Sequence, residues 1–334
     1  MTHVAIIGGG AWGTALACVA RRADNETAIW ARDADVVTSI NAGRGNPHYL
    51  TDVPLEAGIT ASTDLATITR DADTILIVVP SQFVSEITLS MAPHIRPGVP
   101  VVICAKGVEQ GTGKLMTEVL AETLPTAKLA VLSGPTFAQE VARDLPTAFT
   151  LAAQEPDIGE RLADELGTAH FRPYVSDDLI GAEIGGAVKN VLAIACGIVA
   201  GRNLGDNARA ALITRGLAEI VRLGAAKGAR METFMGLSGL GDLTLTCNAM
   251  QSRNFSLGAA LGEGRTLTEI LSERRAVTEG VYSASSVVAL AQDLGVEMPI
   301  CQAVDRVVND GEVIDQAIAG LLSRPFAREH ARED

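Results

Sequence analysis

The sequence contains few cysteines, histidines and aromatic residues. Five cysteines are spread over 334 residues, aromatic residues make up 4% of the chain, and the five histidines are scattered. No CxxC or HExxH pattern occurs, which argues against a zinc site. An odd number of widely spaced cysteines also argues against a disulfide framework. We therefore expect a cytoplasmic protein that holds no metal and no disulfide.

Positive charge is also scarce. The chain has 27 basic and 40 acidic side chains, so its formal net charge is −13. Such a balance argues against nucleic acid or an anionic membrane surface as a general partner. An anionic ligand would have to be held by a local cluster of cations.

Long hydrophobic runs are missing as well. The most apolar segment, residues 187–200, is shorter than the roughly 20 residues that a transmembrane helix requires. The first ten residues read as a strand and lack the basic region and cleavage site of a signal peptide. We expect a globular chain without stable membrane insertion, and its length predicts about two domains.

The N-terminal segment carries a glycine-rich loop in the context that dinucleotide binding requires. The apolar run Val4–Ile7 is followed by Gly8-Gly-Gly-Ala-Trp-Gly13, and an alanine-rich helix is expected over Thr14–Arg22. Gly8 would allow the tight turn, Gly10 the close approach of a pyrophosphate, and Gly13 the contact between helix and strand. The pyrophosphate would lie on the helix N-terminus. The alternative is a structural glycine turn without a ligand.

The end of the second predicted strand, Thr27–Trp30, bears on the choice of cofactor. An acidic residue here favours the free ribose hydroxyls of NAD, whereas a nearby arginine accommodates the 2′-phosphate of NADP. Arg32 and Asp33 are adjacent, so the two signals conflict. Arg32 comes first after the strand, which favours NADP. The alternative for Arg32 is a solvated residue at the start of a helix.

Strands and helices are predicted to alternate as far as about residue 175. This pattern is typical of a mostly parallel sheet with helices on both faces, the Rossmann type of α/β fold. From Asp178 onwards only helical spacing recurs. We therefore expect a dinucleotide-binding domain over residues 1–180 and an all-helical substrate and catalytic domain over residues 181–334. Ligands of such sheets lie beyond the carboxyl ends of the strands, where Lys106 and Gly134–Thr136 follow two predicted strands.

A long apolar helix is expected over residues 181–202, between the two domains. Lys189 and Asn190 lie near the start of its most apolar part. A buried ammonium must be paired or must shift its pKa, and lysine, unlike arginine, can release its proton. Lys189 is therefore a candidate for proton transfer. The alternatives are a structural ion pair and a lysine that reaches the surface.

Two polar segments of the helical domain are further candidates for the site. In Gly236–Cys247, glycines surround Asp242, which indicates either a turn that approaches a ligand closely or a helix connection with Asp242 as the N-cap. Ser252-Arg253-Asn254 can form an anion cradle, because arginine binds phosphate with two parallel hydrogen bonds. The same three residues can equally be the start of a helix.

Taken together, these segments resemble one family of enzymes. The matching segments, in the order of that family, are Gly8–Ala17, Ala105–Glu109, Leu132–Ala142, Gly186–Leu192, Gly236–Cys247 and Ser252–Asn254. They are similar to the bacterial glycerol-3-phosphate dehydrogenase [NAD(P)+] family, over nearly the whole chain. No motif position departs from the family pattern, and the ambiguous stretch is Arg32-Asp33.

The resemblance implies a reaction and a set of site residues. The reaction is reversible hydride transfer between NAD(P)H and dihydroxyacetone phosphate, which gives sn-glycerol 3-phosphate for phospholipid synthesis. By position, Lys189 is the proton donor and acceptor, supported by Asn190, Asp242 and Lys106. The implied substrate contacts are Lys106, Gly134, Thr136, Lys189, Asp242, Ser252, Arg253 and Asn254. The implied cofactor contacts are Gly8, Gly10, Ala11, Trp12, Gly13, Arg32, Asp33, Lys106, Ala138, Arg253, Val277 and Glu279.

Two other readings of the sequence stay open at this stage. One is another two-domain reductase, of the 6-phosphogluconate or β-hydroxyacid dehydrogenase type, which shares the N-terminal unit and a catalytic lysine. The other is a sensor that binds NADP without catalysis. Intact Lys189 and Asp242 argue against the sensor, and the segments 134–140, 236–247 and 252–254 together argue against the other reductases. A homodimer is a hypothesis that the sequence does not decide.

Overall fold

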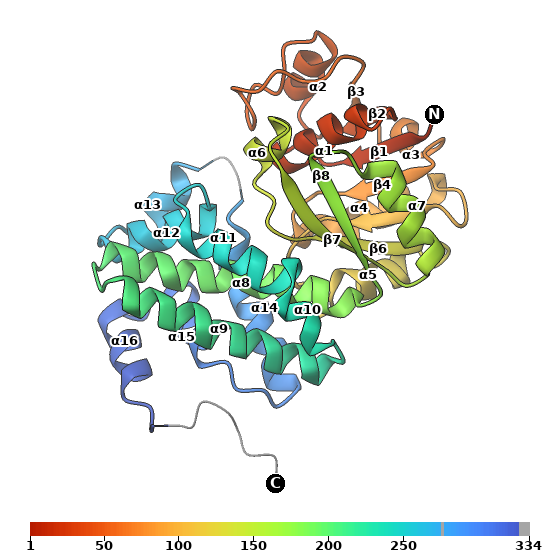
Figure 1. The fold of residues 1–334 in the computed structure, drawn as a ribbon. Coiled ribbons are helices and arrows are strands. Elements are labelled where there is room, and N and C mark those ends of the chain that lie inside the picture. The colour runs from red at the N-terminus through yellow and green to blue at the C-terminus, as the bar shows by residue number, and fades with distance from the viewer. Residues whose placement is uncertain (275–276, 327–334) are drawn as a thin grey trace.

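The computed structural model describes residues 1–274 and 277–326, which form a sheet-containing part followed by a helical part (Figure 1). The sheet has eight strands in the order β3-β2-β1-β4-β5-β6-β7-β8. All neighbouring strands are parallel except β6 and β7, which are antiparallel. The strands are β1 (His3–Ile7), β2 (Glu26–Trp30), β3 (Thr60–Ser62), β4 (Thr74–Ile77), β5 (Pro100–Ile103), β6 (Lys128–Ser133), β7 (Thr147–Ala153) and β8 (Phe171–Ser176).

Helices cover both faces of this sheet, as the alternation in the sequence predicts. Val4 and Ile6 of β1 pack into one apolar core, and Ala5 and Ile7 of the same strand pack into the other. Successive residues of a strand point to opposite faces, so a buried parallel strand has to be apolar throughout. The first core is closed by α1 (Ala11–Arg22), α2 (Ala34–Asn41), α6 (Ala138–Ala142) and α7 (Pro156–Leu166), and the second by α3 (Leu65–Thr69), α4 (Val84–Met91) and α5 (Met116–Thr123).

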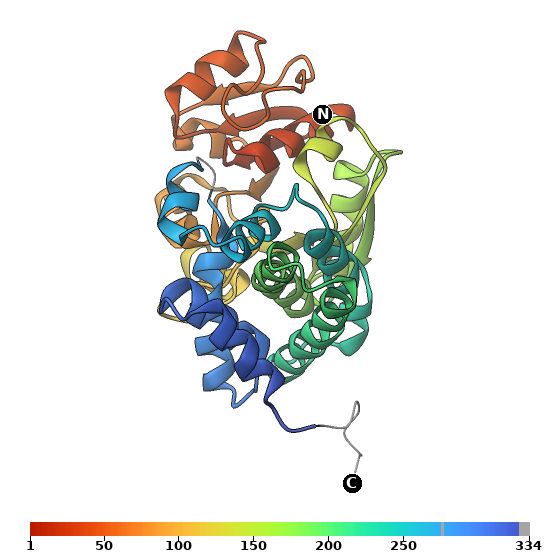
Figure 2. The same cartoon turned by 90° about the vertical axis from the view of Figure 1, so that its left-hand side faces the viewer.

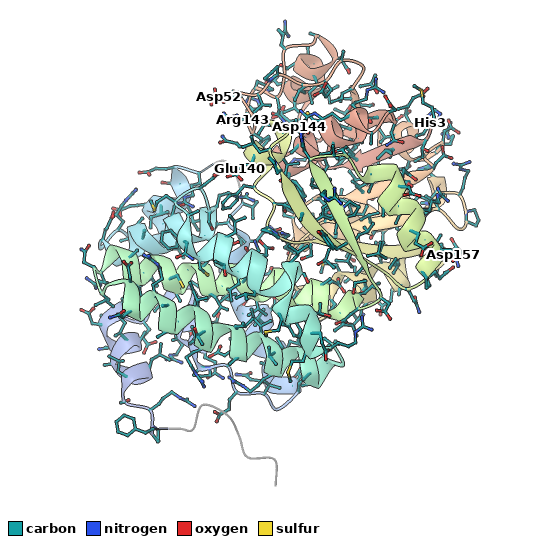
Figure 3. All side chains as sticks on the ribbon, in the orientation of Figure 1. His3, Asp52, Glu140, Arg143, Asp144 and Asp157 are labelled. Atoms are coloured by element: carbon teal, nitrogen blue, oxygen red, sulfur yellow. The ribbon has the colours of Figure 1, made fainter. Side chains whose placement is uncertain are left out.

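Arg22, at the end of α1, fixes α6 to the sheet domain. Its guanidinium donates to the carbonyl oxygens of Val141 and Ala142 at 3.0 and 2.6 Å, and it pairs with Glu56 at 2.8 Å. Figure 3 shows the charged residues around α6, including Asp144, at one edge of the domain, far from His3 at the amino end of the strands. The short helix α6, which the sequence pattern does not predict, therefore has a fixed position beside α1.

The helical part is built around α8 (Leu179–Gly201), which is buried over nearly its whole length. It is long and apolar enough to cross a membrane, but 89% of its most apolar stretch is buried inside the protein, so it is the central helix of a core. Figure 2 shows it end-on, with other helices around it. These are α9 (Asp206–Lys227), α10 (Met231–Met235), α11 (Asp242–Asn248), α12 (Arg253–Gly262), α13 (Leu267–Ser272), α14 (Glu279–Asp293), α15 (Pro299–Asn309) and α16 (Ile314–Leu322).

Helices α8 and α12 cross at very short range because glycines line the contact. A Cβ atom on Gly197 would lie 2.1 Å from the carbonyl oxygen of Phe255, and one on Gly258 would lie 2.1 Å from that of Ile194. Real Cβ atoms essentially never approach another atom within 3.0 Å. This crossing sets the distance between the start of α12 and the segment of α8 that carries Lys189.

The segment around Asp242 differs from the predicted turn. Leu237–Gly241 forms one π-helical turn, and α11 begins directly at Asp242. Gly239 lies so close to the backbone of Phe234 that a Cβ would be 2.2 Å from its carbonyl oxygen. The glycines therefore allow tight helical packing, not an open loop. Asp242 is also not the N-cap of α11, because that position belongs to Gly241.

Candidate active site

A single buried carboxylate, that of Asp242, joins two lysines from different parts of the fold. Lys189 Nζ lies 2.7 Å from Asp242 Oδ1, and Lys106 Nζ lies 2.7 Å from Asp242 Oδ2. Lys189 also donates to the hydroxyl of Thr246 at 2.8 Å, and Lys106 donates to the carbonyl oxygen of Gly134 at 2.9 Å. The side chains of Lys189 and Asp242 are 9% and 1% exposed. The arrangement is a compact Lys–Asp–Lys cluster at the boundary between the two parts of the chain.

The fold explains how these residues meet. Lys106 follows the carboxyl end of β5, and Gly134 follows that of β6, which is the edge of the sheet where ligands are expected. Gly134 has φ +146°, and a Cβ there would lie 3.0 Å from the Cα atom of Phe149, so only glycine fits without strain. Thr136 donates to the same carbonyl oxygen as Lys106, at 3.1 Å. The helical part supplies Lys189 from α8 and Asp242 from α11.

The electrostatics of the cluster favour a lysine that can exchange a proton near neutral pH. Burial lowers the pKa of Lys189 from 10.5 to about 8; Asp242 opposes this shift, and the positive charge of Lys106 adds to it. Two ammonium groups share one carboxylate, so the cluster carries a net positive charge when both lysines are protonated. The two lysines are therefore a local group of cations of the kind that an acidic protein needs in order to bind an anionic ligand.

Asn190 links three elements behind the cluster, because its side chain hydrogen-bonds to the backbone of Lys106 and to Asn254. Its amide donates to the backbone oxygen of Lys106 at 3.3 Å, and its oxygen accepts from Asn254 Nδ2 at 2.9 Å. The oxygen of Asn254 in turn accepts from the backbone N–H of Gly280 at 2.9 Å. Neighbouring residues on a helix point in different directions, so Lys189 and Asn190 serve different partners.

Ser252, Arg253 and Asn254 form the start of α12, and their side chains point to different partners. The Ser252 hydroxyl caps the helix by accepting from the N–H of Phe255 at 3.2 Å. Arg253 is exposed and donates to the carbonyl oxygen of Val277 at 2.6 Å. The helix-start alternative is thus the observed one. An N-terminus that carries an arginine still suits an anion, because helix N-termini attract negative charge.

Glu279, the first residue of α14, faces the positive charges of the site. Burial raises the pKa of its carboxyl group, and Arg253, Lys189 and Lys106 oppose that rise. Val277, two residues earlier, is held by Arg253 as described above. Glu279 therefore interacts with the charges of both lysines of the cluster, and Val277 is connected to the site through Arg253.

The glycine-rich loop has the geometry that a dinucleotide requires. Gly8 has φ +135°, and a Cβ there would lie 2.8 Å from the backbone of Val78. A Cβ on Gly13 would lie 1.9 Å from the carbonyl oxygen of Gly8, so glycine is needed for the helix to start this close to β1. Gly10, by contrast, faces open space and is the N-cap of α1. A ligand can therefore approach the backbone at Gly10.

The first turn of α1 is free to bind a pyrophosphate. No side chain caps this helix, and its first turn, from Ala11, has no acidic residue. The indole Nε1 of Trp12 is buried without a hydrogen-bond partner among the described residues. Ala138 begins α6, which packs beside α1. These features fit a nicotinamide dinucleotide whose phosphates lie at the helix N-terminus.

Arg32 and Asp33 differ in how far each is already engaged. Arg32 is exposed and forms no ion pair or hydrogen bond within the described part of the chain. Asp33 is the N-cap of α2, since its Oδ1 accepts from the N–H of Asp35 at 3.0 Å. Its Oδ2 lies 3.5 Å from His48 Nε2.

Two contributions lie outside the predicted set of site residues. Thr246 lies one turn after Asp242 on α11 and binds Lys189, a spacing that becomes visible only once this segment is known to be helical. Thr244, by comparison, is exposed. Asn46 is buried, and its amide donates to the carbonyl oxygen of Gly9 at 2.9 Å and to Thr14 Oγ1 at 2.8 Å. The sequence around Asn46 indicates only a turn.

A Rossmann-type domain joined to a helical domain with a buried lysine–aspartate pair defines a two-domain dehydrogenase that uses a nicotinamide cofactor. Residues 3–158 match the family description "NAD-dependent glycerol-3-phosphate dehydrogenase N-terminus", and residues 178–319 match the corresponding C-terminus. The chain belongs to the NAD-dependent glycerol-3-phosphate dehydrogenase family, and it is an oxidoreductase.

Individual relatives agree with this assignment. The chain is 58% identical to glycerol-3-phosphate dehydrogenase [NAD(P)+] of Rhodospirillum rubrum, over 99% of this chain and 95% of the relative. It is 57% identical to the protein of the same name from Parvibaculum lavamentivorans, over 98% of both. The crystal structure of glycerol-3-phosphate dehydrogenase from Coxiella burnetii superposes with a TM-score of 0.93 at 42% identity, covering 97% of this chain and 99% of that one. The predicted fold class and family are thereby confirmed.

Proposed function

We propose that this protein reduces dihydroxyacetone phosphate to sn-glycerol 3-phosphate with NADPH, reversibly, and that Lys189 carries the proton. The observation that supports this most directly is the sharing of Asp242 between Lys189 and Lys106, each at 2.7 Å. The product would supply glycerophospholipid synthesis, which requires a phosphorylated glycerol backbone.

In the direction of reduction, a proton must reach the oxygen that becomes the hydroxyl of the product. Lys189 in its protonated form can deliver this proton and stabilise the developing negative charge on that oxygen. Asp242 holds the ammonium group in place, and Thr246 fixes its direction. A reduced nicotinamide cofactor, when bound, would supply the hydride.

In the direction of oxidation, Lys189 must instead accept the proton of the substrate hydroxyl. Its pKa of about 8 makes the neutral form accessible near neutral pH. Lys106 contributes by repelling the proton of Lys189 and by adding positive charge beside the reacting oxygen. We assign Asn190 a positioning role, because it holds the backbone of Lys106.

The remaining residues would bind the substrate and the cofactor. For the substrate phosphate we propose Ser252, Arg253 and Asn254, at the N-terminus of α12, with Gly134 and Thr136 beside the carbon chain. For the cofactor we propose the loop Gly8–Gly13, Arg32 for the 2′-phosphate, and the residues Ala138, Val277 and Glu279. Arg253 lies between the two groups, because it contacts Val277.

We further propose residues 1–180 as the cofactor domain and residues 181–334 as the helical substrate domain, in a cytoplasmic enzyme that forms homodimers. The preference for NADPH is supported by the engagement of both Asp33 oxygens, one by a helix cap and one by His48. An acid that is already engaged is less able to bind the ribose hydroxyls of NAD.

Initial rates with NADPH and NADH, measured across a small set of substrates, test the proposal. We expect turnover of dihydroxyacetone phosphate with both cofactors and a higher kcat/KM with NADPH. 6-Phosphogluconate and a β-hydroxyacid serve as controls; they are offered with NADP+ and NAD+, because they are substrates for oxidation, and should not be turned over. Turnover of one of these, without turnover of dihydroxyacetone phosphate, would contradict the proposed substrate. Cofactor binding without turnover of any substrate would instead indicate a sensor.

A further inference from the structure

The segment between α2 and β3 lies on the cofactor loop and brings a histidine to the end of β2. Asn46 is 1% exposed and ties this segment to Gly9 and Thr14 through its amide group. Its oxygen accepts from the backbone N–H groups of His48 and Tyr49, both at 3.2 Å. The backbone position of His48 is thus fixed relative to the glycine-rich loop.

His48 faces Asp33, the acidic residue whose indication of NAD conflicts with the indication of NADP from Arg32. Its Nε2 lies 3.5 Å from Asp33 Oδ2, with side-chain exposures of 24% for His48 and 44% for Asp33. Asp33 Oδ1 is held by the N–H of Asp35, so one oxygen caps α2 and the other faces the imidazole. The carboxylate of Asp35 also lies within 4.8 Å of this pair.

The charge balance at this point matters for any ligand with a phosphate on the adenosine ribose. An uncompensated carboxylate at the end of β2 repels a 2′-phosphate and attracts ribose hydroxyls, which favours NAD. Arg32 alone would oppose that repulsion from an exposed position. An imidazole on the outer oxygen of Asp33, which forms an ion pair with it when protonated, removes much of the repulsion and leaves Arg32 to bind the phosphate.

We propose that His48 is a specificity-determining residue for NADP, because its imidazole pairs with the outer oxygen of Asp33 and screens the 2′-phosphate from that carboxylate. The inference rests on the proposed function, since it concerns the same cofactor site. A third residue, His48, would thus resolve the conflict between Arg32 and Asp33. The segment around Asn46 holds His48 in place.

Binding of cofactor fragments tests this role without turnover. Titration calorimetry of the whole protein with 2′,5′-ADP and with 5′-AMP isolates the contribution of the 2′-phosphate. We expect wild type to bind 2′,5′-ADP more tightly. His48→Gln should weaken 2′,5′-ADP by about three- to tenfold at low ionic strength and leave 5′-AMP within about twofold, as expected for partly exposed charges. The loss should shrink as salt is added.

Asp33→Asn provides the decisive second variant, because asparagine caps a helix as well as aspartate does but carries no charge. In that background, His48→Gln should cost little further affinity for 2′,5′-ADP. His3→Gln is the matched control, since His3 pairs with Glu26 at 3.2 Å at the other end of the strands, and it should leave both affinities unchanged. Thermal unfolding of each variant checks that the fold is retained.

Two results would overturn the role of His48. Equal losses for 2′,5′-ADP and 5′-AMP would make His48 a structural part of the adenosine site. A full loss that persists with Asp33→Asn would mean that His48 acts on the phosphate itself and not through Asp33. If wild type shows no preference for 2′,5′-ADP over 5′-AMP, the proposed preference for NADPH is wrong. Turnover of dihydroxyacetone phosphate with NADH would then show whether the proposed enzyme activity still holds.

Discussion

Lys189 and Asp242 are 53 residues apart in the sequence, yet Nζ of one lies 2.7 Å from Oδ1 of the other inside the protein. Replacing a buried ion pair with apolar residues is often neutral or stabilising, so such a pair is weak evidence for a structural purpose. Lys106 on the second oxygen of Asp242 makes burial of the cluster more unfavourable, because two cations are brought close together. An arrangement of this kind is better explained by chemistry than by stability.

Removal of the Lys189 ammonium should therefore abolish most of the turnover. We expect Lys189→Ala to lower kcat by at least about 10²-fold, the usual contribution of a positioned acid or base. The Kd for NADPH, measured by fluorescence titration, should stay within a few-fold of wild type. Lys128→Ala is a suitable control, because Lys128 pairs with Glu155 on the surface and away from the site. A Lys189→Ala variant that keeps a tenth of wild-type kcat would show that another group carries the proton.

The lowered pKa of Lys189, about 8, predicts opposite pH dependences for the two directions of the reaction. Reduction needs the protonated lysine, so its kcat/KM should fall as pH rises through about 8. Oxidation needs the neutral lysine, so its kcat/KM should rise over the same interval. Profiles between pH 6 and 10, each at saturating cofactor, measure both.

A variant of Lys106 tests the cause of that shift. The positive charge of Lys106 lowers the pKa of Lys189, so Lys106→Met should move both midpoints to higher pH, whatever happens to the absolute rates. Midpoints that stay in place, or profiles that move in the same direction for reduction and oxidation, would contradict the assignment of the titrating group to Lys189.

The sequence predicted which elements form this site better than it predicted the contacts between their side chains. The glycine-rich loop, the alternation of strands and helices, and the lysine in an apolar helix all follow from local patterns, and the structure has each of them. The position of Lys106 after a strand end was enough to place it at the ligand edge of the sheet. Its contact with Asp242 could not be predicted, because it depends on how the helical part packs against that edge.

The details that the sequence left open depend on tertiary packing. Gly236–Cys247 reads as a turn because glycines disfavour helices, but here they permit a tight π-turn against Phe234 and a helix that starts at Asp242. The polar run Ser252-Arg253-Asn254 left both an anion cradle and a helix start open, and the structure has the helix start, where three successive side chains point to different partners. Packing overrides local propensity in the first case, and helical geometry separates neighbours in the second.

Arg32 should select NADP over NAD through the 2′-phosphate. We expect Arg32→Ala to raise the KM for NADPH much more than the KM for NADH, because only the former carries that phosphate. Arg70→Ala, which removes another exposed arginine of the same domain, is the control for a general change in charge. Equal increases for the two cofactors would mean that Arg32 does not bind the 2′-phosphate.

The glycine crossing of α8 and α12 predicts a large effect on the stability of the protein. In Gly258→Ala the new Cβ would lie 2.1 Å from the carbonyl oxygen of Ile194, so the helices must separate. We expect a loss of about 3 kcal/mol or more in the free energy of unfolding, at the upper end of overpacking effects. Urea denaturation followed by circular dichroism gives the value.

Gly320→Ala is the matched control for this change. Gly320 lies within α16, and a Cβ there would meet nothing within 4 Å. Alanine is favoured over glycine in a helix, so the control should gain about 0.5–1 kcal/mol. A Gly258→Ala variant as stable as this control would mean that the two helices can move apart at little cost.

Arg253 is placed between two phosphate-bearing ligands, and a pair of substrates separates its roles. It lies exposed at the start of α12, and its Nη1 donates to the carbonyl oxygen of Val277 at 2.6 Å, which leaves other guanidinium donors for an anion. A charged hydrogen bond to the substrate phosphate should contribute roughly 1.5–3 kcal/mol. Binding energy from a remote group also orients the reacting carbonyl, so kcat should fall together with affinity.

We therefore expect Arg253→Ala to lower kcat/KM for dihydroxyacetone phosphate by at least about tenfold, the lower end of that range, and to leave the slow rate with unphosphorylated dihydroxyacetone nearly unchanged. Both substrates are measured at saturating NADPH, and Arg274→Ala controls for the loss of a neighbouring guanidinium, which donates to the carbonyl oxygen of Arg253. Equal losses on the two substrates, with a raised Kd for NADPH, would assign Arg253 to the cofactor through Val277. The substrate phosphate would then depend on Lys106, Ser252 and Asn254.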